Sequence, residues 1–124
     1  MQGTIFFAHG SRDPLWRKPV EAIAVRTREL APAMRVECAY LELTQPDIFT
    51  CVHGLAVQGV LTITIVPLFL GVGKHAREDL PKLLAELMVK HPTIRFAMRP
   101  AIGEDDQVVD LIARIALREP RQPL

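Results

Sequence analysis

The segment Val66-Pro-Leu-Phe-Leu-Gly-Val-Gly-Lys-His75 ends an apolar run with two glycines and then presents a lysine and a histidine. A second histidine has the same setting, because the short apolar run Ile5-Phe-Phe-Ala8 leads directly into His9-Gly-Ser-Arg-Asp13. Two predicted strands therefore each deliver a histidine at their carboxyl end. In an open α/β sheet, the loops at this end of the strands form the ligand crevice. Two imidazoles that converge there suit a divalent transition metal.

The apolar pattern switches repeatedly between strand-like and helix-like periodicity, which is typical of βα units around a parallel sheet. Strands are expected at about 4–8, 35–41, 60–66 and 94–98. Helices are expected after Pro14 to about 30, from Pro46 to about 58, from about Asp79 to 90 and from about 105 to 117. We predict a flavodoxin-like α/β half-domain with a four-stranded parallel sheet in the order 2-1-3-4 and helices on both faces. The third strand is apolar nearly throughout, as expected for a strand covered on both faces.

Composition narrows the class of protein. The chain has 124 residues, of which 49% are hydrophobic and 23% charged, so we expect one domain with a substantial core. A formal net charge of +1 gives no support for nucleic-acid binding. The apolar stretch 60–72 contains Pro67 and is shorter than the roughly 20 residues of a membrane span, and no leader precedes the first strand. We therefore expect a cytoplasmic protein with no nucleic-acid or membrane partner.

The candidate metal ligands are His9, His75 and Glu42. Neutral imidazole is a good ligand for Co²⁺, Ni²⁺, Fe²⁺ or Zn²⁺, and imidazole also transfers protons near neutral pH. Glu42 follows the second strand, which neighbours the first in the predicted order, so its carboxylate can reach the same crevice as an oxygen ligand or a proton acceptor. The alternative for Glu42 is a solvated loop carboxylate. His53 and His91 are read as surface residues, on a helix and at a helix end respectively.

Basic residues accompany these candidates. Arg12, Lys74 and Arg77 lie near the two histidines in the sequence and favour a polyanionic substrate, since arginine pairs with carboxylates through two hydrogen bonds. The alternative is an ordinary solvated helix start. Gly71 and Gly73 allow the backbone to approach a bulky flat ligand, although the glycine pair alone is a weak signal.

Three motifs together resemble the CbiX family of sirohydrochlorin chelatases in its short form: His9-Gly-Ser-Arg-Asp-Pro14, Leu41-Glu-Leu-Thr-Gln-Pro46, and the segment from Val66 to Pro81. The resemblance covers roughly residues 1–117. It implies a single chelatase domain over residues 1–118. The tail at 119–124, which contains two prolines, is expected to be flexible. It also implies insertion of a divalent metal, typically cobalt, into sirohydrochlorin on the way to cobalamin. The third motif departs from the family pattern at Val72, where a second glycine is expected.

The resemblance also assigns roles to the candidate residues. His9 and His75 match the family's metal-binding and catalytic histidines, and Glu42 matches an acidic residue near the metal. Arg12, Gly73, Lys74 and Arg77 are the candidates for binding the tetrapyrrole.

The resemblance further implies that the metal is a substrate and that no organic cofactor is needed. Longer chelatases contain two such halves, so a homodimer is expected. The alternatives are a siroheme ferrochelatase or nickel chelatase on the same substrate, and a non-catalytic carrier of metal or tetrapyrrole. The ligand types do not separate Co²⁺, Ni²⁺ and Fe²⁺, because the affinity order of these ions is largely intrinsic to the metals.

Overall fold

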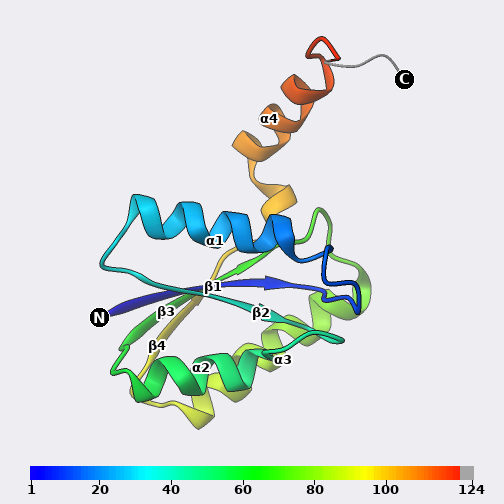
Figure 1. Cartoon of the computed structure of the whole chain (residues 1–124). Helices are drawn as coiled ribbons and strands as arrows, with labels where there is room; N and C mark the ends of the chain where they lie inside the picture. Colours follow the sequence, from blue (N-terminus) through cyan, green and yellow to red (C-terminus); the bar gives the residue numbers. More distant parts are fainter. Residues whose placement is uncertain (121–124) are drawn as a thin grey trace.

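A computed structural model gives the structure of the protein, and it describes residues 1–120 (Figure 1). The elements along the chain are β1 (Gln2–Ala8), α1 (Lys18–Leu30), β2 (Arg35–Tyr40), α2 (Ile48–Val57), β3 (Thr62–Pro67), α3 (Lys74–Lys90), β4 (Arg95–Met98), the 3₁₀ helix η1 (Ile102–Glu104) and α4 (Asp106–Ala116). No helix in this part of the chain is long and apolar enough to cross a membrane. Most of the expected tail, residues 121–124, lies outside the described residues, so its flexibility stays a prediction.

The sheet confirms the predicted topology. Its four strands lie in the order β2-β1-β3-β4, and every neighbouring pair is parallel. Helix α1 covers one face, and α2 and α3 cover the other (Figure 1). Because all strands run the same way, their carboxyl ends share one edge, where the chain continues from β1 into His9 and from β3 towards His75. This edge is called the carboxyl edge below.

The core explains why the strands are so apolar. Successive side chains of a strand point to opposite faces, so that Phe7 joins the main core beneath α2 and α3 whereas Phe6 packs with Ala24 beneath α1. Fully buried Ile65 and Leu87 belong to the main core as well. Strand β1 therefore carries apolar side chains on both faces, as parallel strands inside an α/β protein do, whereas β3 presents Ile63 and Ile65 on one face and Thr64 and Val66 on the other.

Helix α3 begins earlier than the sequence predicted. The expectation of a start at Asp79 with Pro81 in the first turn is wrong: the helix begins at Lys74, with Gly73 as its N-cap residue. The backbone N–H of Arg77 donates to the Gly73 carbonyl at 3.0 Å, so helical hydrogen bonding is established before Asp79. Pro81 consequently lies inside the helix, where it cannot donate such a bond.

Helix α2 shows a smaller difference of the same kind. Pro46 was expected in its first turn, but the helix begins at Ile48 and Pro46 precedes the N-cap residue Asp47. The Asp47 carboxylate accepts a hydrogen bond from the Thr50 N–H at 2.8 Å and another from the Thr50 hydroxyl at 2.9 Å. An aspartate in this position satisfies a backbone N–H that has no partner within the helix.

Helix α4 stands apart from the rest of the molecule. It projects away from the sheet on the side of α1 (Figure 1), and none of its residues is buried. The second face of β3 is correspondingly less covered than predicted. Thr64 and Val66, which point to that face, stay half-buried, whereas Ile63 and Ile65 on the opposite face are buried.

Candidate functional site at the carboxyl edge

The pairing of β1 with β2 continues beyond both strands and places His9 beside Glu42. The Leu41 N–H donates to the Ala8 carbonyl at 2.9 Å, and the Glu42 N–H donates to the His9 carbonyl at 2.9 Å. The two predicted ligands are therefore linked through their backbones. Below, the His9 loop denotes residues 9–17 and the Glu42 loop residues 41–47.

A glycine and a threonine bring these two loops into close contact. Gly10 has a positive φ of 102°, and a Cβ at this position would lie 1.7 Å from the Glu42 carbonyl oxygen. Only glycine fits here, because both the conformation and the space exclude a side chain. The Thr44 hydroxyl accepts a hydrogen bond from the Ser11 N–H at 2.9 Å and donates one to the Ser11 carbonyl at 2.7 Å. The His9 loop is thus fixed on the Glu42 loop.

The His9 ring packs against Phe69, a residue that sequence reasoning did not single out. The two ring centroids lie 4.4 Å apart at an interplanar angle of 44°. Phe69 is itself only 4% exposed and lies 6.2 Å from Phe7, so it anchors one side of the imidazole in the main core. The remainder of His9 is exposed to solvent. The sequence contained one indication of a role for Phe69, because this residue lies in the same strand-end motif as His75.

His75 has a different setting. It was expected in a strand-end loop, but it lies in the first turn of α3, where it is exposed. Gly71 and Gly73 in the preceding glycine loop, residues 68–73, face open space, with no atom within 4 Å of a Cβ built on either residue. Val72, which replaces an expected glycine, packs half-buried against the main core and thereby holds the middle of this loop.

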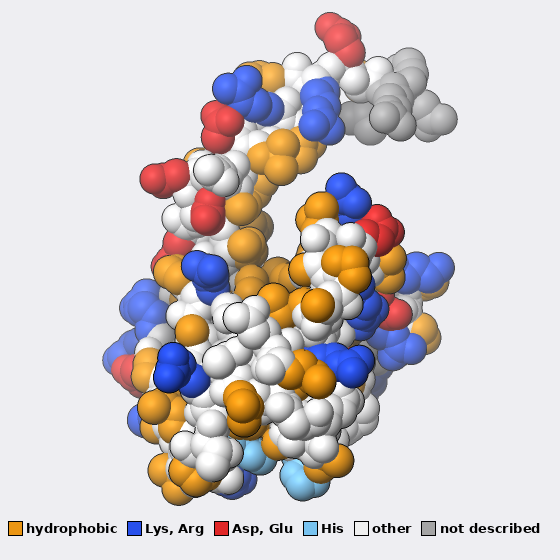
Figure 2. All heavy atoms as spheres, turned by 90° about the vertical axis from the view of Figure 1, so that its left-hand side faces the viewer, with side chains coloured by type: hydrophobic (Ala, Val, Ile, Leu, Met, Phe, Trp, Pro, Cys, Tyr) orange, Lys and Arg blue, Asp and Glu red, His pale blue; other side chains and the backbone are white. Residues whose placement is uncertain are grey.

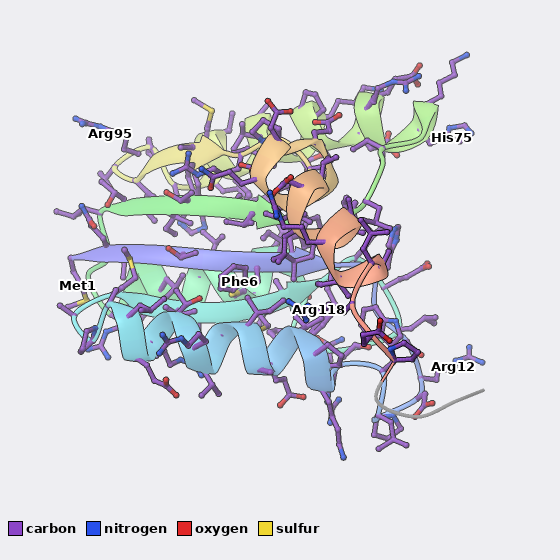
Figure 3. The ribbon with its side chains drawn as sticks, turned by 90° about the horizontal axis from the view of Figure 1, so that it is seen from above. Met1, Phe6, Arg12, His75, Arg95 and Arg118 are labelled. Carbon is purple, nitrogen blue, oxygen red and sulfur yellow. The ribbon has the colours of Figure 1, made fainter. Side chains whose placement is uncertain are left out.

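The basic candidates do not gather into one cluster. Figure 3 places Arg12 and His75 at the same edge of the sheet but towards opposite sides of it, with both side chains directed away from the body. The Arg77 guanidinium donates to the Val72 carbonyl at 3.1 Å, so it braces the glycine loop. Arg12 and Lys74 are exposed and form no ion pair with any of the described residues.

Residues 1–120 of one copy do not assemble a metal site by themselves. Among residues 1–120, no three His, Cys, Asp or Glu side chains lie close enough together to hold a metal ion. The structure brings His9 and Glu42 together along neighbouring loops, while His75 comes from α3. The assignment of these three residues as metal ligands stays a prediction.

The two cysteines are not suited to the chemistry of this edge. Burial raises the pKa of the Cys51 thiol to about 12 and also raises the pKa of Cys38. Both thiols are therefore protonated at neutral pH, whereas a nucleophile or a metal ligand has to be a thiolate. They form no disulfide.

One aromatic pair lies behind the His9 loop. Trp16 lies in that loop and is partly exposed, and its ring centroid is 6.1 Å from that of Tyr40, in an edge-on arrangement. Burial raises the pKa of Tyr40 to about 12, so the hydroxyl stays neutral. The pair joins the His9 loop to the end of β2.

These features together define a flavodoxin-like α/β domain in which polar side chains meet at the carboxyl edge of the strands, the usual ligand position in this class. The sequence model of the CbiX family matches residues 3–118. The chain therefore belongs to the CbiX family, and this confirms the resemblance inferred from the three motifs.

Comparisons with individual proteins agree with the family. The chain is 38% identical over 84 residues to the sirohydrochlorin cobaltochelatase of Methanopyrus kandleri, covering 68% of this chain and 59% of that protein. It is 28% identical over 111 residues to the sirohydrochlorin ferrochelatase of Bacillus subtilis, covering 90% of this chain and 42% of that protein. The chain thus spans about half the length of these two curated relatives.

A solved structure confirms the fold. The crystal structure of a Marinobacter aquaeolei VT8 protein, described as a cobalamin (vitamin B12) biosynthesis CbiX protein, superposes with a TM-score of 0.83 at 32% identity. The match covers 94% of this chain and 94% of that chain.

Proposed function

We propose that this protein is a chelatase that inserts a divalent metal, Co²⁺ in the first place, into sirohydrochlorin for the synthesis of cobalamin. The observation that carries the proposal is the setting of His9 in a CbiX-family chain. Its backbone is hydrogen-bonded to Glu42 and its ring rests on Phe69, while the remaining imidazole surface is open to solvent. A side chain held in this way loses little conformational freedom when it binds a ligand.

Metal insertion defines what the residues must do. The reaction replaces two pyrrole protons with M²⁺, so the site has to bind the metal as its waters leave and also accept the protons. Imidazole performs both tasks, because its neutral form is a metal ligand and a base. We assign both to His9 and His75. Glu42 adds a carboxylate that supplies a metal ligand or receives a proton.

Sirohydrochlorin carries acetate and propionate groups around its ring, and we assign their binding to the basic residues of the same edge. Arg12 and Lys74 are exposed and without ion pairs among the described residues, so they are available for carboxylates. Arg77 and Gly73 lie at the start of α3, where Arg77 already braces the loop. Binding energy from the carboxylates would support the distortion that exposes the pyrrole nitrogens.

We further propose that the active species is a homodimer. One copy offers a single wall to a flat macrocycle, whereas ligand sites usually enclose most of the ligand surface. The match to the Bacillus subtilis relative covers 90% of this chain but only 42% of that protein, so a second copy would supply the half that the longer protein contains. A second copy could complete the metal ligand set, which one chain leaves unassembled among its described residues.

Iron is the second candidate metal. The similarity to a relative named sirohydrochlorin ferrochelatase favours it, and imidazole and carboxylate ligands accept Co²⁺, Ni²⁺ and Fe²⁺ alike. The same site would then make siroheme. The choice between the metals depends on rates, and these can be measured side by side.

The test is an anaerobic absorbance assay of sirohydrochlorin with Co²⁺, Ni²⁺ and Fe²⁺ in turn. His9→Ala and His75→Ala should each lower the rate with the preferred metal by about 100-fold or more, the usual contribution of a positioned acid or base. His53→Ala, on the exposed surface of α2, is the matched control and should keep the wild-type rate. Circular dichroism verifies that each variant is folded.

Two outcomes would contradict the proposal. Wild-type rates in the folded His9→Ala variant would remove His9 from the reaction. Tight binding of metal or sirohydrochlorin without a metallated product, for all three metals, would identify a carrier instead of an enzyme.

A further inference from the structure

Leu43 has a backbone conformation that is unusual for a leucine. Its φ is 63°, in the left-handed region that glycine and asparagine adopt more readily. The residues on both sides impose this conformation, because the Glu42 backbone touches Gly10 and the Thr44 hydroxyl is hydrogen-bonded to Ser11. The Leu43 side chain is 55% exposed, so it is not there to fill the core. The fold therefore holds an apolar side chain in water at a cost in free energy.

Leu70 has a comparable setting in the glycine loop. The Gly103 N–H donates to the Phe69 carbonyl at 3.0 Å, and a Cβ at Gly103 would lie 1.9 Å from the Leu70 carbonyl oxygen. The 3₁₀ helix η1 therefore packs on the backbone of this loop at its start, next to the Phe69 ring that supports His9. The Leu70 side chain is nevertheless 72% exposed. Here too, a firmly held backbone presents an apolar side chain to solvent.

The sheet topology places the two leucines on either side of His9. Strand β1, which leads to His9, pairs with β2 on one side and with β3 on the other. Leu43 comes shortly after the end of β2, and Leu70 shortly after the end of β3. Because neighbouring strands lie about 4.8 Å apart, the loops after β2 and β3 are separated by about 10 Å across β1. This separation is comparable with the width of a tetrapyrrole ring.

Exposure alone does not distinguish these two leucines. Figure 2 views the molecule from the amino ends of the strands, and hydrophobic side chains are scattered over that surface as well, among polar and charged ones. Leu30, the last residue of α1, is 69% exposed near that end of the sheet. Single exposed leucines of this kind are ordinary. Leu43 and Leu70 differ from Leu30 because their backbones are held by other loops and because they flank a candidate metal ligand.

We infer that Leu43 and Leu70 form an apolar platform for one face of the tetrapyrrole ring, with the His9 imidazole between them. The inference rests on the proposed function and names the residues that bind the ring itself, whereas the basic residues bind its carboxylates. The ring is flat and apolar, and its charged groups lie at its periphery. Apolar side chains whose backbones are already fixed lose little freedom when the ring packs on them. Their burial adds binding energy that offsets the distortion of the ring.

The platform makes the site specific for a ring. Arg12 and Lys74 attract any polyanion, whereas contact with an apolar platform separates a macrocycle from an open chain that carries the same carboxylates. The two contributions respond differently to salt. Ion pairs at an exposed edge weaken as the ionic strength rises, while the burial of leucine side chains does not depend on charge.

The first experiment measures the Kd of metal-free sirohydrochlorin from the change in its absorbance, so that no metallation takes place. Leu43→Gly and Leu70→Ala should each raise the Kd by about 10-fold, as the loss of one leucine contact does. Leu43→Met keeps an apolar side chain and should bind within about 3-fold of wild type. Leu30→Ala is the matched control for Leu70→Ala and should leave the Kd unchanged.

The salt dependence of the same Kd separates the platform from the basic residues. The effects of Leu43→Gly and Leu70→Ala should be equal in about 0.05 M and about 0.5 M NaCl, whereas the effect of Arg12→Gln should shrink at the higher salt. Effects of the leucine substitutions that disappear at high salt would overturn the proposal, because they would show that the leucines act through the charged groups.

The second experiment measures thermal unfolding of Leu43→Gly. Glycine adopts a positive φ without strain, so the midpoint should rise by about 1 to 4 °C although the affinity for sirohydrochlorin falls. Such a gain in stability with a loss of binding is the mark of a residue held in place for a ligand. A lower midpoint would show that Leu43 serves the fold and would overturn its assignment to the platform.

Three further outcomes decide the matter. A wild-type Kd in the folded double variant Leu43→Gly/Leu70→Ala would overturn the platform. A changed oligomeric state of that variant in light scattering would overturn it as well, because the leucines would then belong to a contact between copies. A wild-type chain that binds no sirohydrochlorin would remove both the platform and the proposed activity. By contrast, wild-type binding that depends on the two leucines but yields no metallated product would keep the platform and remove the proposed activity alone.

Discussion

The loop that carries His9 and the loop that precedes His75 differ in how firmly they are held. The His9 loop is joined to the Glu42 loop by three hydrogen bonds, has a glycine packed against the Glu42 backbone, and rests its imidazole on Phe69. The glycine loop before His75 has two glycines in open space and is held in the middle by Val72. The fold therefore fixes the position of one candidate ligand, His9, and leaves backbone freedom next to the other, His75. A site that binds and releases both a metal and a macrocycle, as proposed for this edge, can use one firmly held side chain and one next to a loop with backbone freedom.

The largest effect is expected from Gly10→Ala. A methyl group there meets the Glu42 carbonyl in a conformation that alanine rarely adopts, so the free energy of unfolding should fall by about 2 to 3 kcal/mol in urea denaturation. Gly71→Ala is the matched control, because nothing lies within 4 Å of the added carbon, and it should change stability by less than about 1 kcal/mol. Equal losses of unfolding free energy in the two variants would show that the two loops are held equally firmly.

A smaller effect is expected from Thr44→Val. This change keeps the shape of the side chain but removes both hydrogen bonds to Ser11, and it should cost about 1 to 2 kcal/mol because the Ser11 N–H loses its partner. Thr93→Val, at an exposed position, is the control. Chemical denaturation of both variants measures the difference. An unchanged free energy of unfolding for Thr44→Val would mean that the backbone bonds alone fix the loop.

The smallest effect concerns Asp47, which ends the Glu42 loop and caps α2. Asp47→Ala should lower the free energy of unfolding by about 1 kcal/mol at pH 7, as the loss of a helix cap does. Hydrogen bonds from the Thr50 N–H and hydroxyl hold the pKa of Asp47 below its usual range. A folded-state pKa below the unfolded value means that the stabilisation is fully present above the unfolded pKa of about 3.9 and is lost as the pH falls through the folded pKa.

The corresponding measurement is thermal unfolding of Asp47→Ala and Asp47→Asn from pH 7 down to pH 3. The gap between wild type and Asp47→Ala should narrow at the acidic end. Asparagine keeps an acceptor for the Thr50 N–H and has no charge to titrate. The difference in stability between Asp47→Asn and Asp47→Ala should therefore not change as the pH falls. A gap that stays constant down to pH 3 would show that the charge of Asp47 contributes nothing to the cap.

The elements and their order were predictable because the local signals agree with the fold. The apolar runs that end at Ala8 and Val66 predicted two central strands, and the alternation of strand and helix patterns predicted a flavodoxin-like sheet, from which the order 2-1-3-4 was expected. The start of α3 was missed because Pro81 was read as a first-turn proline. The apolar spacing of Leu80, Leu84 and Leu87, which extends back to Ala76, was the better guide to that boundary.

Two features of the site could not be predicted from one sequence. The contact between His9 and Phe69 joins residues from different strand ends, so it depends on the register between β1 and β3. The close approach of Gly10 to Glu42 likewise depends on how two loops meet in space. The sequence also could not predict that α4 projects from the body of the molecule. An amphipathic pattern shows that a helix needs a partner surface, but it does not show where that surface lies.

The contact between Trp16 and Tyr40 gives the protein an optical reporter of its own. Trp16 is the only tryptophan of the chain, so all tryptophan emission originates in the His9 loop. Cobalt and nickel ions have unfilled d shells and quench a nearby fluorophore, whereas zinc, with a filled d shell, lacks that route. Steady-state fluorescence of the unlabelled protein can thus follow a metal ion as it reaches this loop, before any tetrapyrrole is added.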